Sequence, residues 1–247
     1  MKFDRRQLMV YAVTDRAWTG KMSLCEQVEA ALKGGATMVQ MREKGLTNDT
    51  VQDYLEEARS LRALTERYKV PLIIDDNIKL ALLCGADGVH VGQNDMDAAQ
   101  ARALLGPDKI LGVTAKTVEQ ALKAQEQGAD YLGSGAVFGT STKADALPMT
   151  MERLGEICRS VSIPVVAIGG ICLENIGKLK GSGAAGAAVV SGIFGAEDIE
   201  GTVRQMREMV GEWGGIAHKD EYITFGASTL EWVLSLYLDH KVTGYGF

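Results

Sequence analysis

The sequence predicts an α/β protein folded as a closed (β/α)₈ barrel, the TIM barrel. Eight short apolar runs alternate with longer amphipathic segments along the chain, which is typical of parallel strands covered by helices on both faces. A Gly-Ala pair recurs before four of these runs, at intervals of about two strand–helix units. The first run, LMVYAVT, is followed by DRAWTG and not by the G-x-G-x-x-G turn of an open dinucleotide-binding sheet. The closed barrel is therefore favoured.

The expected strands are short and rich in β-branched or apolar residues. In chain order they are LMVYAVT, TMVQMR, PLIID, GVHVG, KILGVTA, DYLGSGAVF, PVVAIGG and AAVVSGIF. Between them, apolar residues recur at the 3.6-residue spacing of an amphipathic helix, over residues 24–32, 51–68, 118–127 and 151–161. The glycine of each Gly-Ala pair, such as Gly35, is expected to end a helix in the left-handed conformation just before the next strand.

The barrel is expected to form a single catalytic domain over residues 1–211. The remaining residues, 212–247, begin with a glycine-rich segment and contain one amphipathic helix pattern over residues 228–238. This extension fits a cap, a dimerisation element or a disordered tail. Assembly into a homo-oligomer is therefore left open.

Composition narrows the possible partners. The chain has 247 residues, of which 46% are hydrophobic, and it carries a formal net charge of −6. Such a chain can bury a large core but offers no broad cationic surface, so we expect neither nucleic acid nor a membrane as its main partner. Its four cysteines form no C-x-x-C pair, and no apolar stretch approaches about 18 residues. We expect a cytoplasmic protein in which any anion-binding site is confined to a small part of the surface.

Polar side chains are expected to gather at the carboxyl ends of the strands, where (β/α)₈ barrels carry their active sites. The second strand ends in QMREK. Because side chains alternate along an extended segment, Gln40, Arg42 and Lys44 point the same way and present an amide and two cations. On its own, this segment also fits a solvated strand end with ordinary surface charges.

Carboxylates follow the third and fourth strands. IIDDN supplies Asp75 and Asp76, and HVGQND ends in Asp95. Adjacent strands lie about 5 Å apart, so one carboxylate from each can converge on a cation. Oxygen ligands of this kind favour Mg²⁺ that stays partly hydrated and shares a phosphate group. Each aspartate alone fits a helix N-cap equally well, but the pair at matching strand ends indicates a metal site.

Hydroxyls and glycines follow the last four strands. The fifth ends in GVTAKT, which places Thr114 and Lys116 on the rim. The sixth ends in GAVFGTSTKADA, whose hydroxyls and lysine can surround an anion or form a locally bonded polar turn. The last two end in AIGGI and VVSGIF, where backbone amides can approach a phosphate, although glycines also end strands for steric reasons. The residues concerned are Thr140, Ser141, Thr142, Lys143, Gly169, Gly170, Ser191 and Gly192.

The number of cations at this end of the barrel indicates how much negative charge the ligand carries. Arg42, Lys44, Lys143 and a divalent metal would gather on one arc, beside the glycine-rich arc of the last two strands. One phosphate does not need so many cations, whereas a metal-bound pyrophosphate beside a second, singly phosphorylated molecule does. His90 is interpreted as structural.

Together these motifs resemble the thiamine phosphate synthase family. The resemblance covers residues 11–194 and is carried by QMREK, IIDDN, GADGVHVGQND, LGVTAKT, GAVFGTSTKADA, VAIGGI and VVSGIF. It implies a Mg²⁺-dependent transferase that joins hydroxymethylpyrimidine pyrophosphate to a thiazole phosphate, or to its carboxylate form, with release of pyrophosphate. It implies no protein nucleophile, because the thiazole nitrogen already has a lone pair and the aminopyrimidine can stabilise a cation as the C–O bond stretches.

The resemblance also implies a role for each motif. The pyrimidine pyrophosphate would be held by Gln40, Met41, Arg42, Glu43 and Lys44, with Asp75, Thr114 and Lys143. Mg²⁺ would be bound by Asp76 and Asp95. The thiazole phosphate would be held by Thr140, Ser141, Thr142, Gly170, Val190 and Ser191. The catalytic residues, acting on the departing pyrophosphate, would be Arg42, Lys44, Lys143 and Thr114.

Two positions depart from the family pattern. The family usually has asparagine at Asp75, which here adds a negative charge beside a polyanion, and often has proline at Gly139. Two other functions stay open. One is a thiazole tautomerase of the same fold, which needs no metal and carries a histidine where this chain has Lys116. The other is a barrel that binds phosphate ligands, or a partner protein through its tail, and catalyses nothing.

Overall fold

A computed structural model of the chain describes residues 3–20, 22–139 and 148–213. The chain divides into two compact units, residues 1–215 and 216–247. The second unit, which includes the helix expected over residues 228–238, lies outside the described residues, so the role of the extension stays a prediction. None of the described helices is long and apolar enough to span a membrane.

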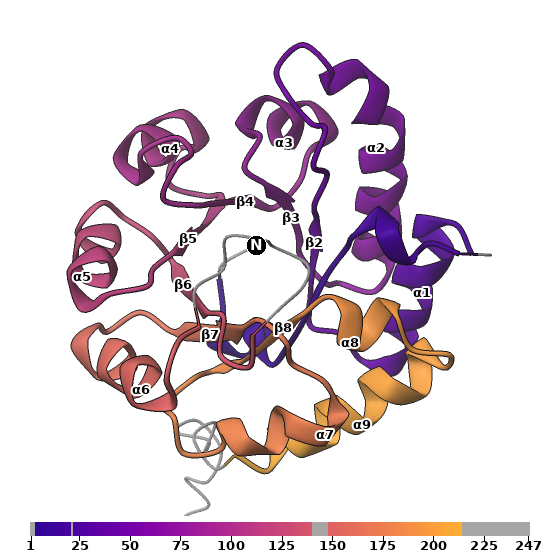
Figure 1. The fold of residues 1–247 in the computed structure, drawn as a ribbon. Coiled ribbons are helices and arrows are strands. Elements are labelled where there is room, and N and C mark those ends of the chain that lie inside the picture. Colours follow the sequence, from indigo (N-terminus) through magenta and orange to yellow (C-terminus); the bar gives the residue numbers. More distant parts are fainter. Residues whose placement is uncertain (1–2, 21, 140–147, 214–247) are drawn as a thin grey trace, which may run out of the picture. The chain divides into compact units, whose positions relative to one another are not determined.

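The first unit contains the predicted barrel (Figure 1). Its eight parallel strands pair in chain order, and β8 closes the sheet by pairing with β1. The strands are β1 (Val10–Val13), β2 (Met38–Met41), β3 (Leu72–Asp75), β4 (Gly88–Val91), β5 (Ile110–Thr114), β6 (Tyr131–Gly135), β7 (Val165–Ile168) and β8 (Gly186–Val189). The expected fold class is confirmed, and each of the eight expected runs contains a strand. The end of the last run, SGIF, was expected to continue the strand but forms the short helix α8 (Ser191–Phe194).

Helices surround the sheet on its outer side (Figure 1). They are α1 (Leu24–Gly34), α2 (Val51–Arg67), α3 (Ile78–Cys84), α4 (Ala98–Leu105), α5 (Val118–Glu126), α6 (Met151–Ser160), α7 (Leu173–Ile176), α8 (Ser191–Phe194) and α9 (Ile199–Gly211). Short 3₁₀ helices occupy Arg5–Leu8, Arg16–Trp18 and Gly177–Leu179. The four helices that apolar spacing predicted are present. Gly35 ends α1 with φ 99°, as expected of a left-handed C-cap.

The amino-terminal end of the barrel is closed by apolar packing. Leu8 precedes β1, and Met38 and Ile110 are the first residues of β2 and β5; all three are buried inside the barrel. Most polar inward-facing residues, among them Gln40, His90 and Thr114, come later along their strands, whereas Tyr131 is the first residue of β6. Because all eight strands start at the same end, this order leaves room for a cavity toward their carboxyl ends.

Glycines in β5 and β6 make room for larger side chains inside the barrel. A Cβ atom on Gly112 would lie 2.2 Å from Tyr131 Cζ and 2.5 Å from His90 Nδ1. A Cβ atom on Gly133 would lie 3.0 Å from His90 Cε1. These two glycines therefore allow a tyrosine and a histidine to lie side by side in the centre of the sheet.

Candidate active site

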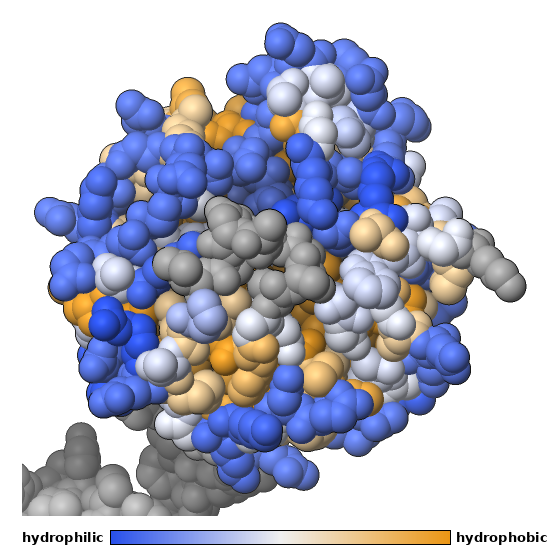
Figure 2. Space-filling view, in the orientation of Figure 1, coloured by the Kyte–Doolittle hydropathy of each residue, from blue (hydrophilic) through white to orange (hydrophobic). Residues whose placement is uncertain are grey.

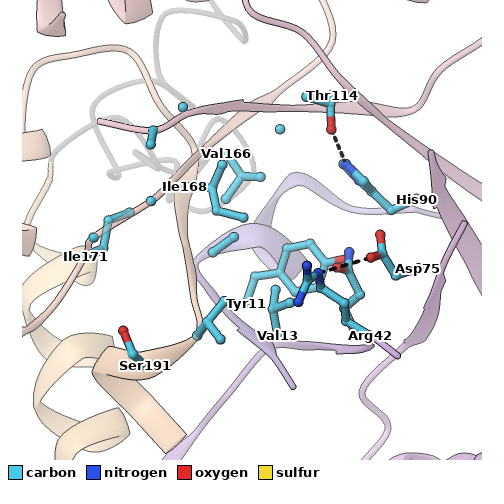
Figure 3. Close-up of a pocket in the computed structure, with 18 of the residues that line it drawn as sticks. Tyr11, Val13, Arg42, Asp75, His90, Thr114, Val166, Ile168, Ile171 and Ser191 are labelled. Carbon is cyan, nitrogen blue, oxygen red and sulfur yellow. Dashed lines mark hydrogen bonds and ion pairs between the residues drawn. The ribbon is translucent and has the colours of Figure 1, made fainter. Parts of the chain in front are cut away.

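The centre of the barrel holds a cavity of about 150 Å³ (Figure 3). Each of the eight strands contributes at least one of its lining residues. The apolar side chains of the lining belong to Val13, Ala136, Val166, Ile168, Ile171, Ala188 and Val190. The polar part is Tyr11, Gln40, Arg42, Asp75, His90, Thr114, Lys116 and Ser191.

Most of the site residues predicted within the described part of the chain meet in this cavity. Its lining includes Gln40, Arg42, Asp75, Thr114, Gly170, Val190 and Ser191. Lys116, which the sequence placed on the rim without a role, lines the cavity as well. The predicted residues Thr140, Ser141, Thr142 and Lys143 lie outside the described residues.

Two hydrogen bonds join the end of β1 to the end of β2 next to the predicted cations. The backbone N–H of Arg42 donates to Thr14 Oγ1 at 3.0 Å, and the N–H of Thr14 donates to the Gln40 carbonyl at 2.9 Å. The Arg42 guanidinium lies between two carboxylates. Its Nη1 is 3.2 Å from Asp15 Oδ2, and its Nε is 3.4 Å from Asp75 Oδ2, the ion pair drawn in Figure 3. The position of this cation is therefore fixed before a ligand binds.

Lys44 lies outside the cavity lining but is joined to the same cluster. Its Nζ is 3.4 Å from Asp15 Oδ2, the oxygen that also contacts Arg42. Asp15 is only 6% exposed, and its Oδ1 accepts a hydrogen bond from the Ala17 N–H at 3.0 Å. One buried carboxylate thus holds both predicted cations of the QMREK motif.

Met41 and Glu43, which the resemblance placed in substrate binding, have their side chains outside the cavity. Successive side chains point to opposite sides of an extended segment, so Met41 is fully buried and Glu43 faces Arg16, with Arg16 Nε 2.7 Å from Glu43 Oε2. Burial raises the pKa of Glu43 above its ordinary value, although Arg16 opposes the shift. Neither side chain is positioned to touch a ligand in the cavity.

A hydrogen-bonded chain of side chains crosses the barrel interior. Gln40 Nε2 donates to Tyr11 Oη at 2.7 Å, and Tyr11 Oη lies 2.9 Å from Tyr131 Oη. His90 Nδ1 lies 3.1 Å from Tyr131 Oη, and His90 Nε2 lies 3.0 Å from Thr114 Oγ1. We define these five residues as the polar chain. Burial raises the pKa of both tyrosines above the ordinary value, so both hydroxyls stay protonated.

Residue-by-residue reasoning on the sequence did not find Tyr11 and Tyr131 and interpreted His90 as structural. The available signal was a polar aromatic residue inside each of three otherwise apolar strands, VYAV, GVHV and YLGSG. The connection among them depends on lateral neighbours in the sheet, which the linear sequence does not display.

A neighbouring arc of the cavity, across β1 from the Arg42 side, is built from the ends of β7 and β8. Gly169 and Gly170 have φ 103° and 65°, and a Cβ atom on Gly170 would lie 2.0 Å from the Gly139 carbonyl oxygen. Only glycine fits this crowded left-handed turn. Gly169, Gly170, Val190 and Ser191 line the cavity, so backbone groups reach it here without intervening long side chains. We call these four residues the glycine arc.

The two sides of the molecule also differ in polarity on the face shown in Figure 2. Hydrophilic residues dominate over the β2–β4 side, whereas a group of apolar residues lies over β7 and β8. The ionic cluster around Arg42 belongs to the first side and the glycine arc to the second.

The two predicted metal ligands belong to the lining of a second pocket. Asp76 and Asp95 both line it, together with Asn48, Asn77 and Lys79. Asp76 has φ 54°, an uncommon left-handed conformation for a residue other than glycine, and it lines a different pocket from its neighbour Asp75. Asp95 Oδ2 accepts the Gly92 N–H at 2.6 Å. No group of three or more His, Cys, Asp or Glu side chains suited to a metal occurs among the described residues.

The fold and cavity together define a class of protein: a (β/α)₈-barrel enzyme with its active site at the carboxyl ends of the strands. Residues 10–193 match the family described as thiamine monophosphate synthase. The chain belongs to that family.

Individual relatives agree with this assignment. The thiamine-phosphate synthase of Ruminiclostridium cellulolyticum is 49% identical over 81% of this chain and 94% of its own length. That of Clostridium acetobutylicum is 48% identical over 81% of this chain and 94% of its own length. Among solved structures, thiamine phosphate pyrophosphorylase from Pyrococcus furiosus superposes with a TM-score of 0.78 at 39% identity, over 85% of this chain and 99% of that chain.

Proposed function

We propose that this chain makes thiamine phosphate by joining hydroxymethylpyrimidine pyrophosphate to a thiazole phosphate, with release of pyrophosphate. The observation that carries the proposal is the division of the cavity into two arcs. Arg42 lies on one arc, held by Asp15 and Asp75, and the glycine arc lies on the other. Two phosphorylated substrates with different charge can occupy these arcs at the same time.

The bond changes balance without a protein nucleophile. The lone pair of the thiazole nitrogen forms a C–N bond to the methylene carbon of the pyrimidine, and the C–O bond to pyrophosphate breaks with its electron pair on the leaving oxygen. The product is a thiazolium ion and free pyrophosphate. The protein has to hold the two reactants in line and stabilise the departing charge.

The residues at β2 supply that stabilisation. The Arg42 guanidinium can donate two parallel hydrogen bonds to phosphate oxygens, and Lys44 adds a second positive charge from the same carboxylate anchor. Lys143 is proposed to act with them. Because Asp15 already holds Arg42 in place, little reorganisation is needed when the polyanion binds.

The remaining predicted residues orient the substrates. Gln40 and Thr114 reach the cavity from β2 and β5 and are proposed to hold the pyrimidine. Gly170, Val190 and Ser191 in the glycine arc are proposed to hold the thiazole phosphate through backbone and hydroxyl donors. Thr140, Ser141 and Thr142 are proposed to complete this second subsite.

Mg²⁺ is proposed to bind at Asp76 and Asp95. The two carboxylates share a pocket at the ends of adjacent strands, and oxygen donors suit this ion. A pair of carboxylates leaves positions for water and phosphate oxygens, as is common for Mg²⁺ shared with a phosphorylated substrate. When bound, the ion neutralises charge on the pyrophosphate group.

A coupled product assay tests the proposal. Purified protein is incubated with both phosphorylated substrates and Mg²⁺, and pyrophosphate and thiamine phosphate are quantified together. We expect equal amounts of the two products, and no pyrophosphate when the thiazole is omitted. Binding of both substrates without turnover would support the non-catalytic alternative, and pyrophosphate release without the thiazole would indicate simple hydrolysis.

A further inference from the structure

The polar chain ends at two residues that face the ligand cavity. Gln40 forms one end on β2, and Thr114 forms the other on β5; both line the cavity. Between them lie Tyr11, Tyr131 and His90, all within hydrogen-bond distance of their neighbours (2.7–3.1 Å). Figure 3 shows His90 reaching Thr114 at the cavity wall. The two ends are therefore linked through the interior of the barrel.

The number of protons along the polar chain limits which atom donates and which accepts in each of its hydrogen bonds. Each tyrosine hydroxyl has one proton to donate, and neutral imidazole carries one proton on one of its two nitrogens. Gln40 Nε2 donates to Tyr11 Oη. If Tyr11 also accepted from Tyr131, its own proton would be buried without an acceptor in the chain, which is costly. Tyr11 therefore donates to Tyr131, and Tyr131 donates to His90 Nδ1.

The tautomer of His90 follows from that order. With Nδ1 accepting a proton from Tyr131, the ring proton is on Nε2 and is donated to Thr114 Oγ1. Thr114 is then left with its own hydroxyl proton to donate. At the other end, no described residue donates to Gln40 Oε1. The two cavity-facing atoms thus have opposite characters, one donor and one acceptor.

The surrounding sheet holds the imidazole ring in this orientation. The ring lies against Gly112 and Gly133, where a larger residue would clash with it. A Cβ atom added at Gly112 would lie 2.5 Å from His90 Nδ1, and one added at Gly133 would lie 3.0 Å from His90 Cε1. Tyr131 packs against the same ring, with centroids 5.6 Å apart. A ring fixed on both sides keeps its two nitrogens directed at Tyr131 and Thr114.

We propose that His90 is a positioning residue which, through its Nε2–H tautomer, makes Thr114 a hydrogen-bond donor and Gln40 Oε1 an acceptor toward the substrate. The assignment of these two residues to the pyrimidine subsite rests on the proposed function. It follows that the substrate presents an N–H group to Gln40 and an acceptor to Thr114, a pattern that an aminopyrimidine satisfies. If the ring proton of His90 moved to Nδ1, every hydrogen bond of the polar chain would reverse its direction. Thr114 would then face the substrate as an acceptor and Gln40 as a donor.

The tautomer can be measured without turnover. Long-range ¹⁵N–¹H correlation spectra of the full chain, labelled with ¹⁵N-histidine at pH 8, distinguish a protonated ring nitrogen from an unprotonated one. The chain has three histidines, and the His90→Gln variant identifies the signal of His90 by its loss. We expect protonated Nε2 and unprotonated Nδ1. The Nδ1–H tautomer would overturn the proposal whether or not the protein makes thiamine phosphate.

A tyrosine variant tests the coupling itself. Tyr131→Phe removes the donor to Nδ1 and is expected to give a mixture of the two His90 tautomers and to lower kcat/KM about tenfold, the effect of about one buried hydrogen bond. Tyr68→Phe is the matched control, because the Tyr68 hydroxyl donates to Glu29 outside the barrel at 3.3 Å. If Tyr131→Phe leaves the tautomer signal unchanged, or changes kcat/KM no more than Tyr68→Phe, the proposal is wrong.

Discussion

Asp15 Oδ2 lies 3.2 Å from Arg42 Nη1, and the same oxygen lies 3.4 Å from Lys44 Nζ. The carboxylate is nearly buried, and its other oxygen caps the turn that follows β1. The first strand therefore fixes the cations that follow the second. Asp15 was absent from the residues predicted from sequence, because TDR after a strand gives no sign of where its carboxylate points.

Asp15→Asn is expected to lower kcat/KM about ten- to a hundredfold, because charge-assisted hydrogen bonds to both cations are lost. Steady-state kinetics with both substrates measure the change. Asp97→Asn provides the matched control: Asp97 caps α4 through the Ala99 N–H at 3.0 Å and lies 3.5 Å from Lys123 Nζ, away from the cavity. Equal rates for the two variants would show that Asp15 only caps its turn.

Arg42→Ala is expected to reduce turnover at least about a hundredfold with the fold intact, because a preorganised charge acting on the leaving group is removed. Circular dichroism and the product assay are measured on the same preparation. Arg153→Ala serves as the control, since Arg153 pairs with Glu156 on the exposed side of α6. An Arg42→Ala enzyme with the wild-type rate would exclude this residue from the mechanism.

Asp75→Asn is expected to keep or improve kcat/KM. Asp75 Oδ2 is 3.4 Å from Arg42 Nε, so its charge competes with a polyanionic substrate for the guanidinium, and an amide removes that competition while keeping the size. Titration with pyrophosphate should show equal or tighter binding in the variant. A loss of activity greater than about tenfold would mean that the reaction requires the Asp75 carboxylate.

Asp95→Asn is expected to raise the Mg²⁺ concentration needed for half-maximal rate at least about tenfold, because the carbonyl oxygen of an amide is a weaker ligand than a carboxylate. The amide can still accept the Gly92 N–H, so the loop should keep its shape. Rates are measured against Mg²⁺ after treatment with a chelator. A wild-type enzyme whose rate does not depend on metal would refute the assignment of Asp76 and Asp95.

Glu43→Gln is expected to change the pH dependence of stability. Burial raises the pKa of Glu43, so the folded state binds its proton more tightly than the unfolded state does, and wild-type stability is lost as pH rises through the folded-state pKa. The variant lacks this loss, so its stability relative to wild type should increase from pH 4 to pH 7. Urea unfolding at both pH values measures the difference; a relative decrease would show that Arg16 outweighs burial.

Side chains alternate between the two faces of a strand, and this alternation explains which site residues could be predicted from the sequence. It placed Gln40 and Arg42 on one face, and both line the cavity. The same alternation directs Glu43 away, against the role implied by the family resemblance. Asp75 and Asp76 line different pockets, and the left-handed backbone at Asp76 is not evident from IIDDN. The polar chain depends on contacts among five strands, whose lateral positions only the folded barrel provides.

The central claim is that two phosphorylated groups bind on separate, neighbouring arcs of one cavity. A crystal structure of the protein with thiamine phosphate, pyrophosphate and Mg²⁺ tests it most directly. We predict pyrophosphate against Arg42 and Lys44, and the phosphate of thiamine phosphate against Gly170 and Ser191. Pyrophosphate bound on another face of the barrel, with Arg42 still paired only to Asp15 and Asp75, would contradict the claim.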